Sequence, residues 1–128
     1  MSSLNNIEIT ACDNQLVIYA IQWGVCYEIC NIKSGNNHAV QVGIQLEAGA
    51  SFSGTLEANG VNGALSEQKT VTLPAGEYSL VYTGLNWGGP YNFDFTFNGH
   101  QYQLQNDASK PLTGAIWNLG NLDLTFSV

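Results

Sequence analysis

The sequence predicts an all-β fold, an antiparallel two-sheet β-sandwich of jelly-roll type with about eight to ten strands, in one domain spanning residues 1–128. Two observations predict it. Apolar and polar residues alternate with a period of two in one segment after another, and clusters of glycine, asparagine and proline separate these segments at regular intervals. Because each such strand has one apolar and one polar face, we expect sheets that pack face to face around a shared core.

The first half of the chain contains four predicted strand segments, which are rich in β-branched and aromatic residues. One of them continues past Gly24, which we expect to form a bulge or a bend inside it, and Trp23 belongs to the expected core. Composition predicts turns at Ser34–Asn37 and Asn59–Gly63. The strand segments are Ile7–Thr10, Gln15–Trp23 continuing into Val25–Ile32, Val40–Leu46 and Ser51–Leu56.

The second half of the chain continues the same pattern. Val71 and Leu73 are expected to point inward from a strand that ends in a turn at Pro74–Gly76. The last predicted strand reaches the C-terminus, which indicates that it pairs inside the sheet. The strand segments are Lys69–Leu73, Tyr78–Tyr82, Asn92–Gln105 with a turn inside it, and Asn121–Val128.

The turn inside the third of these segments is Asn98-Gly99, the strongest short-range signal for a β-hairpin. A two-residue turn there creates three cross-strand pairs on one apolar face, and pairs of this kind stabilise by roughly 0.2–1 kcal/mol each. The polar side chains of both strands then share the opposite face. The pairs on the apolar face are Phe97 with His100, Phe95 with Tyr102, and Phe93 with Leu104.

The charge of the chain excludes one class of function. It has three lysines, no arginine and ten acidic residues, for a net charge of −7. Nucleic-acid binding needs many cations to displace counterions from phosphates, so we expect no nucleic-acid partner. The N-terminus lacks a basic and an apolar signal region, and the apolar run Leu16–Ile21 is far shorter than the roughly 20 residues of a membrane span. We therefore expect a protein that is made in the cytoplasm and whose release needs no signal peptide.

The cysteines are Cys12, Cys26 and Cys30, an odd number that argues against a disulfide framework. In a strand, Cys26 and Cys30 would lie about 13 Å apart, too far for one disulfide or one zinc ion. We expect all three to be buried small hydrophobic residues, and no cofactor is predicted. Calcium stays open because it needs clustered oxygen ligands, which the fold would have to assemble. The candidate calcium ligands are Asp94, Asp107 and Asp123.

No catalytic motif occurs in the chain: there is no nucleophile elbow, no phosphate-binding loop and no zinc-protease helix motif. Most acidic residues occupy turns or outward strand positions, which is typical of solvated groups. His38 lies in a polar turn, and His100 follows the hairpin turn at the rim of the aromatic face. A pair of glycosidase carboxylates brought together by the fold stays open, but we expect a protein without enzymatic activity.

The segment between Tyr82 and Asn92 is the most informative about binding. Trp87 and Tyr91 lie among glycine, asparagine and proline rather than inside an alternating strand. Sugar rings stack their C–H faces on aromatic side chains, and their hydroxyls bind amides and carboxylates. The alternative is that Trp87 folds back to close the end of the core. A second aromatic loop lies near Trp117. The candidate ligand-binding residues are Asn86, Trp87, Tyr91, Asn92, Asp94, Trp117 and Asn118.

Val71–Leu80 resembles the strand–corner–strand element of many β-sandwich modules, in which a Leu-x-x-Gly-x-Tyr corner precedes a core strand. In carbohydrate-binding modules of jelly-roll type, a similar corner is followed by a loop and a strand that carry Asn or Asp beside a ligand-binding aromatic residue. Most such modules are appended to secreted enzymes, whereas this chain more closely resembles a soluble microbial or fungal lectin. The matching positions are Asn86, Trp87, Asn92 and Asp94.

These observations favour a non-enzymatic, lectin-like protein that binds a glycan or glycoconjugate through loop aromatic residues, asparagine and aspartate. We expect a homo-oligomer, because weak single sites become useful through multivalency and sheet edges offer a contact. Two alternatives stay open. A toxin-like, membrane-interacting β-sandwich would place Trp87, Tyr91 and Trp117 at the lipid–water interface, although no basic patch attracts anionic lipid. A self-assembling structural protein would fit the low charge and the high content of asparagine and glutamine.

Overall fold

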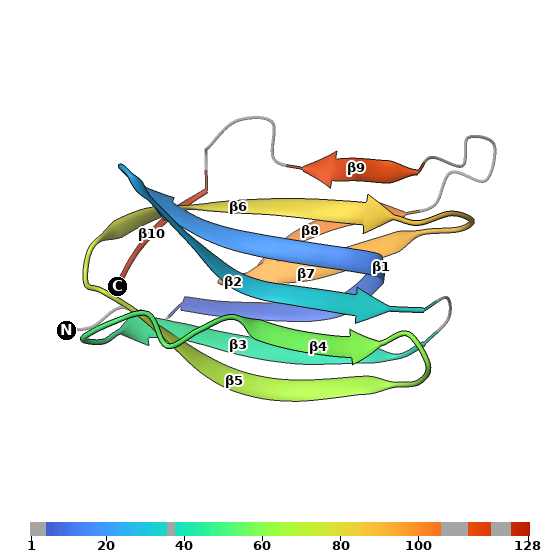
Figure 1. Ribbon diagram of the computed structural model, residues 1–128, viewed down its shortest axis with the longest axis horizontal. Coiled ribbons are helices and arrows are strands. Elements are labelled where there is room, and N and C mark those ends of the chain that lie inside the picture. The colour runs from blue at the N-terminus through green and yellow to red at the C-terminus, as the bar shows by residue number, and fades with distance from the viewer. Residues whose placement is uncertain (1–4, 36–37, 106–112, 119–123) are drawn as a thin grey trace.

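The computed structural model describes residues 5–35, 38–105, 113–118 and 124–128. These residues form ten strands and no helix (Figure 1), which confirms the all-β class. Residues along most strands alternate between buried and exposed, so each strand turns one apolar face to the core. The strands are β1 (Asn5–Gln22), β2 (Val25–Ser34), β3 (Val40–Ala48), β4 (Leu56–Gly60), β5 (Leu65–Leu73), β6 (Glu77–Asn86), β7 (Asn92–Phe97), β8 (His100–Gln105), β9 (Gly114–Asn118) and β10 (Thr125–Ser127).

The long strand β1 organises the sheet because it pairs with four other strands. Its first half lies between β3 and β7, and its second half lies between β2 and β6. The change occurs at Asp13 and Asn14, which both face Ser34 of β2 across a register shift. Because β1 pairs with β3 and β7 at one end and with β2 and β6 at the other, the ten strands form one mixed, nearly barrel-shaped sheet (Figure 1). The two separate sheets of the predicted jelly roll are therefore not confirmed.

Two strand pairs in the described part of the chain are parallel, β2 with β4 and β3 with β5. The prediction of antiparallel pairing was wrong for them, because a period of two shows which face a residue takes but not the direction of the neighbouring strand. The chain passes from β3 to β4 through residues 49–55 and then turns into β5. Strands that are distant in sequence therefore lie side by side and bring their outward side chains together.

The connection between β1 and β2 also differs from the prediction. Instead of a bulge within one long strand, Trp23 and Gly24 form a two-residue turn that is closed by the pairing of Gln22 with Val25. Gly24 has a φ of 75°, which glycine adopts without steric cost. Trp23 is 100% exposed and not in the core, because it lies beyond the last strand pair.

The predicted strand Ser51–Leu56 forms only at its last residue, where β4 begins. Residues 51–55 form a loop that is tied to β5 by hydrogen bonds. The Ser53 backbone N–H donates to the Thr72 carbonyl oxygen at 3.1 Å, and the Thr72 hydroxyl donates to the Ser51 carbonyl oxygen at 2.8 Å. These bonds give backbone groups of the loop hydrogen-bond partners without a regular strand pairing. Alternation of apolar and polar residues does not distinguish such a loop from a strand.

Most other predicted strands are confirmed. Val71 and Leu73 are fully buried on β5, and the turn after them leads into β6. At the start of β6 the Tyr78 hydroxyl donates to the Pro74 carbonyl oxygen at 2.7 Å, which fixes the corner. The strand at the C-terminus forms over Thr125–Ser127 as β10, but within the described residues it pairs with β6 alone, so it lies at an edge and not inside the sheet as expected. The parts of predicted elements that lie outside the described residues are Asn36–Asn37 and Asn121–Asp123.

The hairpin of β7 and β8 is confirmed in its predicted register. Asn98 and Gly99 have φ values of 50° and 86°, the left-handed conformation that a type I′ turn requires at both positions. The resulting pairs bury the three phenylalanines of β7 in the core. The observed pairs are Phe97 with His100, Phe95 with Tyr102, and Phe93 with Leu104.

An aromatic cluster fills the core beside this hairpin. The fully buried Phe95 ring lies 5.2 Å from the Tyr82 ring, 5.3 Å from the Tyr102 ring and 5.6 Å from the Trp117 ring, measured between centroids. Gly84 makes room for the cluster, because a Cβ atom there would lie 3.0 Å from the Phe93 ring and 3.1 Å from the Trp117 Cβ. The cluster therefore depends on an aromatic layer from four strands and on one small residue between them.

Candidate functional site

Trp87 follows the last residue of β6 and is held in a fixed orientation. Its backbone N–H donates to the Asn14 side-chain oxygen at 2.8 Å, and its indole N–H donates to the Gln15 side-chain oxygen at 3.3 Å. The residue is nevertheless 50% exposed. Because the polar edge of the indole is bonded and half of the residue stays open to solvent, Trp87 provides an ordered aromatic surface and does not close the core.

A groove with a volume of about 280 Å³ lies on the outer face of β2 and β4. Gln15 links it to Trp87, since the Gln15 side-chain amide also donates to the Asn31 side-chain oxygen at 2.8 Å. Strand register brings the lining together, because Lys33 pairs with Gln15 on one side and with Asn59 on the other. We call Trp87, Gln15 and this groove the Trp87 site. The groove is lined by Asn31, Lys33, Glu57, Ala58 and Asn59.

The Trp87 site combines several kinds of polar group with one aromatic surface. The amides of Asn31 and Asn59 can each donate and accept hydrogen bonds, the Glu57 carboxylate accepts, and the Lys33 ammonium donates. Glu57 is the one carboxylate among the described residues that line the groove. A ligand with many hydroxyl groups and one apolar face matches this set of partners.

The loop after Trp87 exposes backbone beside the indole. Asn86 is buried and organises the loop: its amide donates to the Gly89 carbonyl oxygen at 3.1 Å, and its side-chain oxygen accepts from the Gly88 N–H at 3.3 Å. Gly88 and Gly89 have positive φ values, and no atom lies within 4 Å of where their Cβ atoms would be. A ligand on the indole can therefore approach the backbone of this loop.

The structure separates the predicted site residues rather than gathering them. Tyr91 is 5% exposed and lies in the core, with its ring 6.4 Å from the Phe93 ring. Trp117 is partly buried, and its ring lies 4.6 Å from the Tyr82 ring. Neither aromatic ring is presented with Trp87. A loop composition rich in glycine and asparagine shows that the segment around Tyr91 turns but not where its ring points. The prediction of a loop at Trp117 was wrong, because Trp117 and Asn118 belong to β9, where Trp117 pairs with Gly84 of β6.

Asn92 and Asp94 point outward from β7 on the other half of the sheet. The Asp94 carboxylate accepts from the Gln101 amide at 3.1 Å through both oxygens, so it is engaged across the hairpin. Asn118 is exposed on β9 opposite Thr83 of β6 and shares the outer face with the groove. Of the seven predicted residues, Trp87 and Asn118 thus lie on the groove face, and Asn86 shapes the adjacent loop.

The groove residues were not predicted from the sequence. Alternation along β2 shows that Asn31 and Lys33 point outward, and the hairpin with β1 would have placed Gln15 beside Lys33 had the turn at Trp23 been recognised. The contribution of Glu57 and Asn59 depends on the parallel pairing of β2 with β4, for which the sequence carries no local signal.

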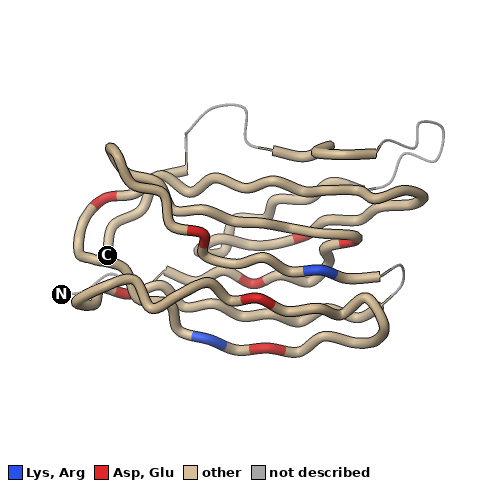
Figure 2. The backbone as a smooth tube through the Cα atoms, in the orientation of Figure 1, with Lys and Arg blue, Asp and Glu red and all other residues tan. Residues whose placement is uncertain are grey.

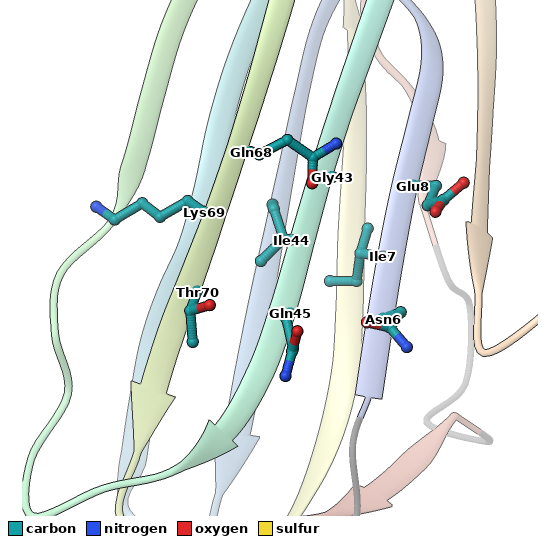
Figure 3. A pocket seen from close by; sticks show the side chains of 9 residues that line it. All are labelled: Asn6, Ile7, Glu8, Gly43, Ile44, Gln45, Gln68, Lys69 and Thr70. Carbon is teal, nitrogen blue, oxygen red and sulfur yellow. The ribbon is translucent and has the colours of Figure 1, made fainter.

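A second groove lies on the outer face of β1, β3 and β5 (Figure 3) and has a volume of about 220 Å³. Gly43 forms its floor, and a Cβ atom there would lie 2.7 Å from the Gln68 amide. Asn6, Glu8 and Gln45 surround it, so its walls are polar. Neither groove has an aromatic side chain among the described residues that line it, but the first groove is linked to the exposed Trp87 indole through Gln15.

Asp13 is a buried acid at the bend of β1, and its Oδ1 atom has no hydrogen-bond partner within the described residues. Burial raises the pKa of the Asp13 carboxyl above its ordinary value of 3.8, and the charge of His38 opposes this shift. The folded state therefore holds the proton more tightly than the unfolded chain. Binding of this proton adds to the free energy of unfolding below pH 3.8, and this contribution is lost as the pH rises through the pKa of the folded state.

An Asp13→Asn variant is expected to have a higher melting temperature than the wild type at neutral pH, because it buries no charge. The difference should shrink as the pH falls to 3.8 and below, where the wild-type carboxyl becomes protonated in the unfolded chain as well as in the folded state. Thermal unfolding followed by circular dichroism across this pH range measures it. Parallel pH profiles for the two proteins would contradict the expected linkage.

The cysteines are free, and their burial differs from the prediction at one position. Cys12 and Cys30 are buried as expected, but Cys26 is exposed because it faces outward near the β1–β2 turn. Burial raises the pKa of the Cys12 thiol to about 12 and that of Cys30 further. No cluster of metal-binding side chains occurs within the described residues. Two of the candidate calcium ligands, Asp107 and Asp123, lie outside those residues.

One cysteine per chain is therefore expected to react with a thiol reagent in the native protein at about pH 8, since the thiolate is the reactive form. A Cys26→Ser variant should react with none until it is unfolded. Titration with a chromogenic disulfide measures the number of reactive thiols. Rapid reaction of two or more thiols in the folded protein would contradict the burial of Cys12 and Cys30.

Comparison of the chain with protein-family models, with curated proteins and with solved structures gives no match. Among the described residues, no helix is long and apolar enough to cross a membrane.

Proposed function

We propose that the protein is a non-enzymatic, lectin-like protein that binds glycans at the Trp87 site. The observation that carries this proposal is the half-exposed Trp87 indole, fixed by Asn14 and Gln15 next to a groove of amides and a carboxylate. One ring of the glycan stacks a face on the indole, and the hydroxyls of a neighbouring ring, which reaches across β1 to the groove, exchange hydrogen bonds with Asn31, Glu57 and Asn59. The exposed glycine backbone after Trp87 leaves space for the edge of the ring.

The composition of the groove supports binding rather than hydrolysis. Glycoside hydrolysis ordinarily uses two carboxyl groups about 5–9.5 Å apart on either side of the scissile bond. The described lining residues supply Glu57 as a carboxylate and Lys33 as a cation, together with amides. This set fits reversible recognition of hydroxyl groups.

The shallow groove also supports the proposal that the protein acts as a homo-oligomer. A single open site on a sheet face gives modest affinity, because much of the ligand stays in solvent. Several copies that bind one glycan-bearing surface together raise the overall affinity through effective concentration. Agglutination of cells or of glycan-coated beads by the purified protein is expected to follow from this arrangement.

Glycan-array binding of the tagged protein, with calcium and with a chelator, tests the proposed function. The expected result is a family of related glycans bound by the wild type, with weaker binding by Asn59→Ala and Glu57→Gln. Gln68→Ala in the second groove is the matched control, because it also removes an outward amide from the sheet, and it should bind as the wild type does. A blank array with folded protein would contradict the proposal.

A further inference from the structure

The turn between β1 and β2 presents an apolar tip that the proposed glycan site does not use. We define the hairpin tip as Ile21–Cys26. Trp23 is 100% exposed, Cys26 is exposed, and Ile21 and Val25 are partly exposed. Tryptophan is highly buried on average, and here the exposed indole stands together with three other exposed or partly exposed apolar residues, so the tip offers an apolar surface to a partner.

The hairpin tip is held firmly enough to present Trp23 outward. Gln22 pairs with Val25 and Ile21 pairs with Cys26, so the strand ladder reaches the turn. The Gln22 side-chain amide also donates to the Glu77 carbonyl oxygen at 3.3 Å, which ties the tip to β6. Its backbone groups are thus largely satisfied, and the tip can enter a less polar surrounding without breaking its ladder.

The charges around the hairpin tip select the kind of surface that it can approach. The tip itself is uncharged, and the nearest acids in sequence and strand register are Glu28 on β2 and Glu77 at the start of β6. The two lysines among the described residues lie elsewhere, Lys69 on β5 and Lys33 near the end of β2 that is far from the tip; basic positions are blue and acidic positions red in Figure 2. This arrangement repels anionic surfaces and attracts cationic groups.

We propose that the hairpin tip inserts Trp23 into the interface of a lipid bilayer with neutral, choline-type headgroups. Tryptophan favours the headgroup level of a membrane, where its ring is partly buried and its N–H stays wet. The quaternary ammonium of choline is attracted both to an indole face and to the carboxylates of Glu28 and Glu77. A projecting turn also suits a deformable lipid surface, because a specific protein partner would need a broad complementary patch.

This inference uses a different tryptophan from the toxin-like alternative derived from the sequence. Of the two other residues that this alternative places at the membrane, Tyr91 is buried in the core and Trp117 packs, partly buried, against it. Among the described residues, the exposed large hydrophobic ones are Trp23 and Trp87. They lie at opposite ends of β6, since Gln22 contacts the start of β6 and Trp87 follows its end. Membrane contact and glycan binding are therefore separable by mutation.

Flotation with phosphatidylcholine vesicles tests the inference. The wild type is expected to float with them, and Trp23→Ala should lower the bound fraction at least about tenfold, while Trp87→Ala binds as the wild type does. Adding phosphatidylserine should weaken binding. Phosphatidylcholine brominated near the headgroup should quench the emission of the wild type and of Trp87→Phe but much less that of Trp23→Phe. Because Trp23 is fully exposed, its variants should keep the wild-type circular dichroism and melting temperature.

Two outcomes would overturn the inference. One is equal flotation of the wild type and Trp23→Ala, or no flotation of either protein. The other is a dimer in analytical ultracentrifugation without lipid that Trp23→Ala dissociates, which would make a second copy of the chain the partner of the tip. Neither outcome changes the expected glycan-array result, because the tip and the Trp87 site share no residue.

Discussion

Replacing Phe95 with alanine is expected to lower the free energy of unfolding by about 3–5 kcal/mol, the range for deletion of a fully buried phenylalanine. Phe95 is 0% exposed and contacts the rings of Tyr82, Tyr102 and Trp117. Its removal leaves a cavity in a layer of large rigid rings that cannot close without moving several strands. Equilibrium unfolding in urea measures the loss, as a lower midpoint at unchanged slope.

Thr96→Ala is the matched control for Phe95→Ala, because Thr96 is the next residue on β7 and points outward. A substitution outside the core should change the free energy of unfolding by less than about 1 kcal/mol. If Thr96→Ala destabilised the protein as much as Phe95→Ala, the observed register of the β7–β8 hairpin and its apolar face would be wrong.

Replacing Trp87 with alanine is expected to reduce glycan binding at least about tenfold, which corresponds to 1.4 kcal/mol of binding free energy. The change removes the stacking surface but leaves the groove residues and the backbone bond to Asn14 in place. Since Trp87 is half exposed, we expect a loss of folding stability of about 1 kcal/mol. The effect is measured on the glycans that the wild type binds on the array, by comparing the protein concentrations that give half-maximal binding for the wild type and the variant.

Two further variants distinguish loss of stacking from loss of fold. Trp87→Phe keeps an aromatic face but loses the indole N–H bond to Gln15, so it should bind with intermediate affinity. Trp23→Ala removes an equally large exposed side chain at the other end of β6 and should bind glycans as the wild type does. Unchanged binding by Trp87→Ala would show that the indole is not part of the site.

Local signals predicted the parts of the fold that depend on neighbouring residues. Asn98-Gly99 defined both the turn and the register of its hairpin, because left-handed turn positions and alternation act over a few residues. The same approach failed at Trp23-Gly24, where β-branched and aromatic residues continue on both sides and hide a two-residue turn. Recognising that turn would have moved Trp23 from the core to the surface.

The candidate site was predictable only where it depends on one loop. The glycine-rich surroundings of Trp87 identified it as an unusual aromatic residue, and its exposure fits that interpretation. Gln15 joins it through the pairing of β1 with β6, and Glu57 through the pairing of β2 with β4; these strands are not consecutive, and no local pattern encodes their pairing. The same reasoning failed for Tyr91, which lies in the same glycine-rich loop but whose ring is buried in the core.

The most direct test of the proposed glycan site is a titration followed through the indole N–H signals in two-dimensional nitrogen–proton NMR spectra. The three tryptophans give three such signals, which Trp→Phe variants assign. With the glycan that the array identifies as the strongest ligand, the Trp87 signal is expected to shift progressively to saturation, while the Trp23 and Trp117 signals stay in place. Saturable binding of that glycan with a stationary Trp87 signal would contradict the account.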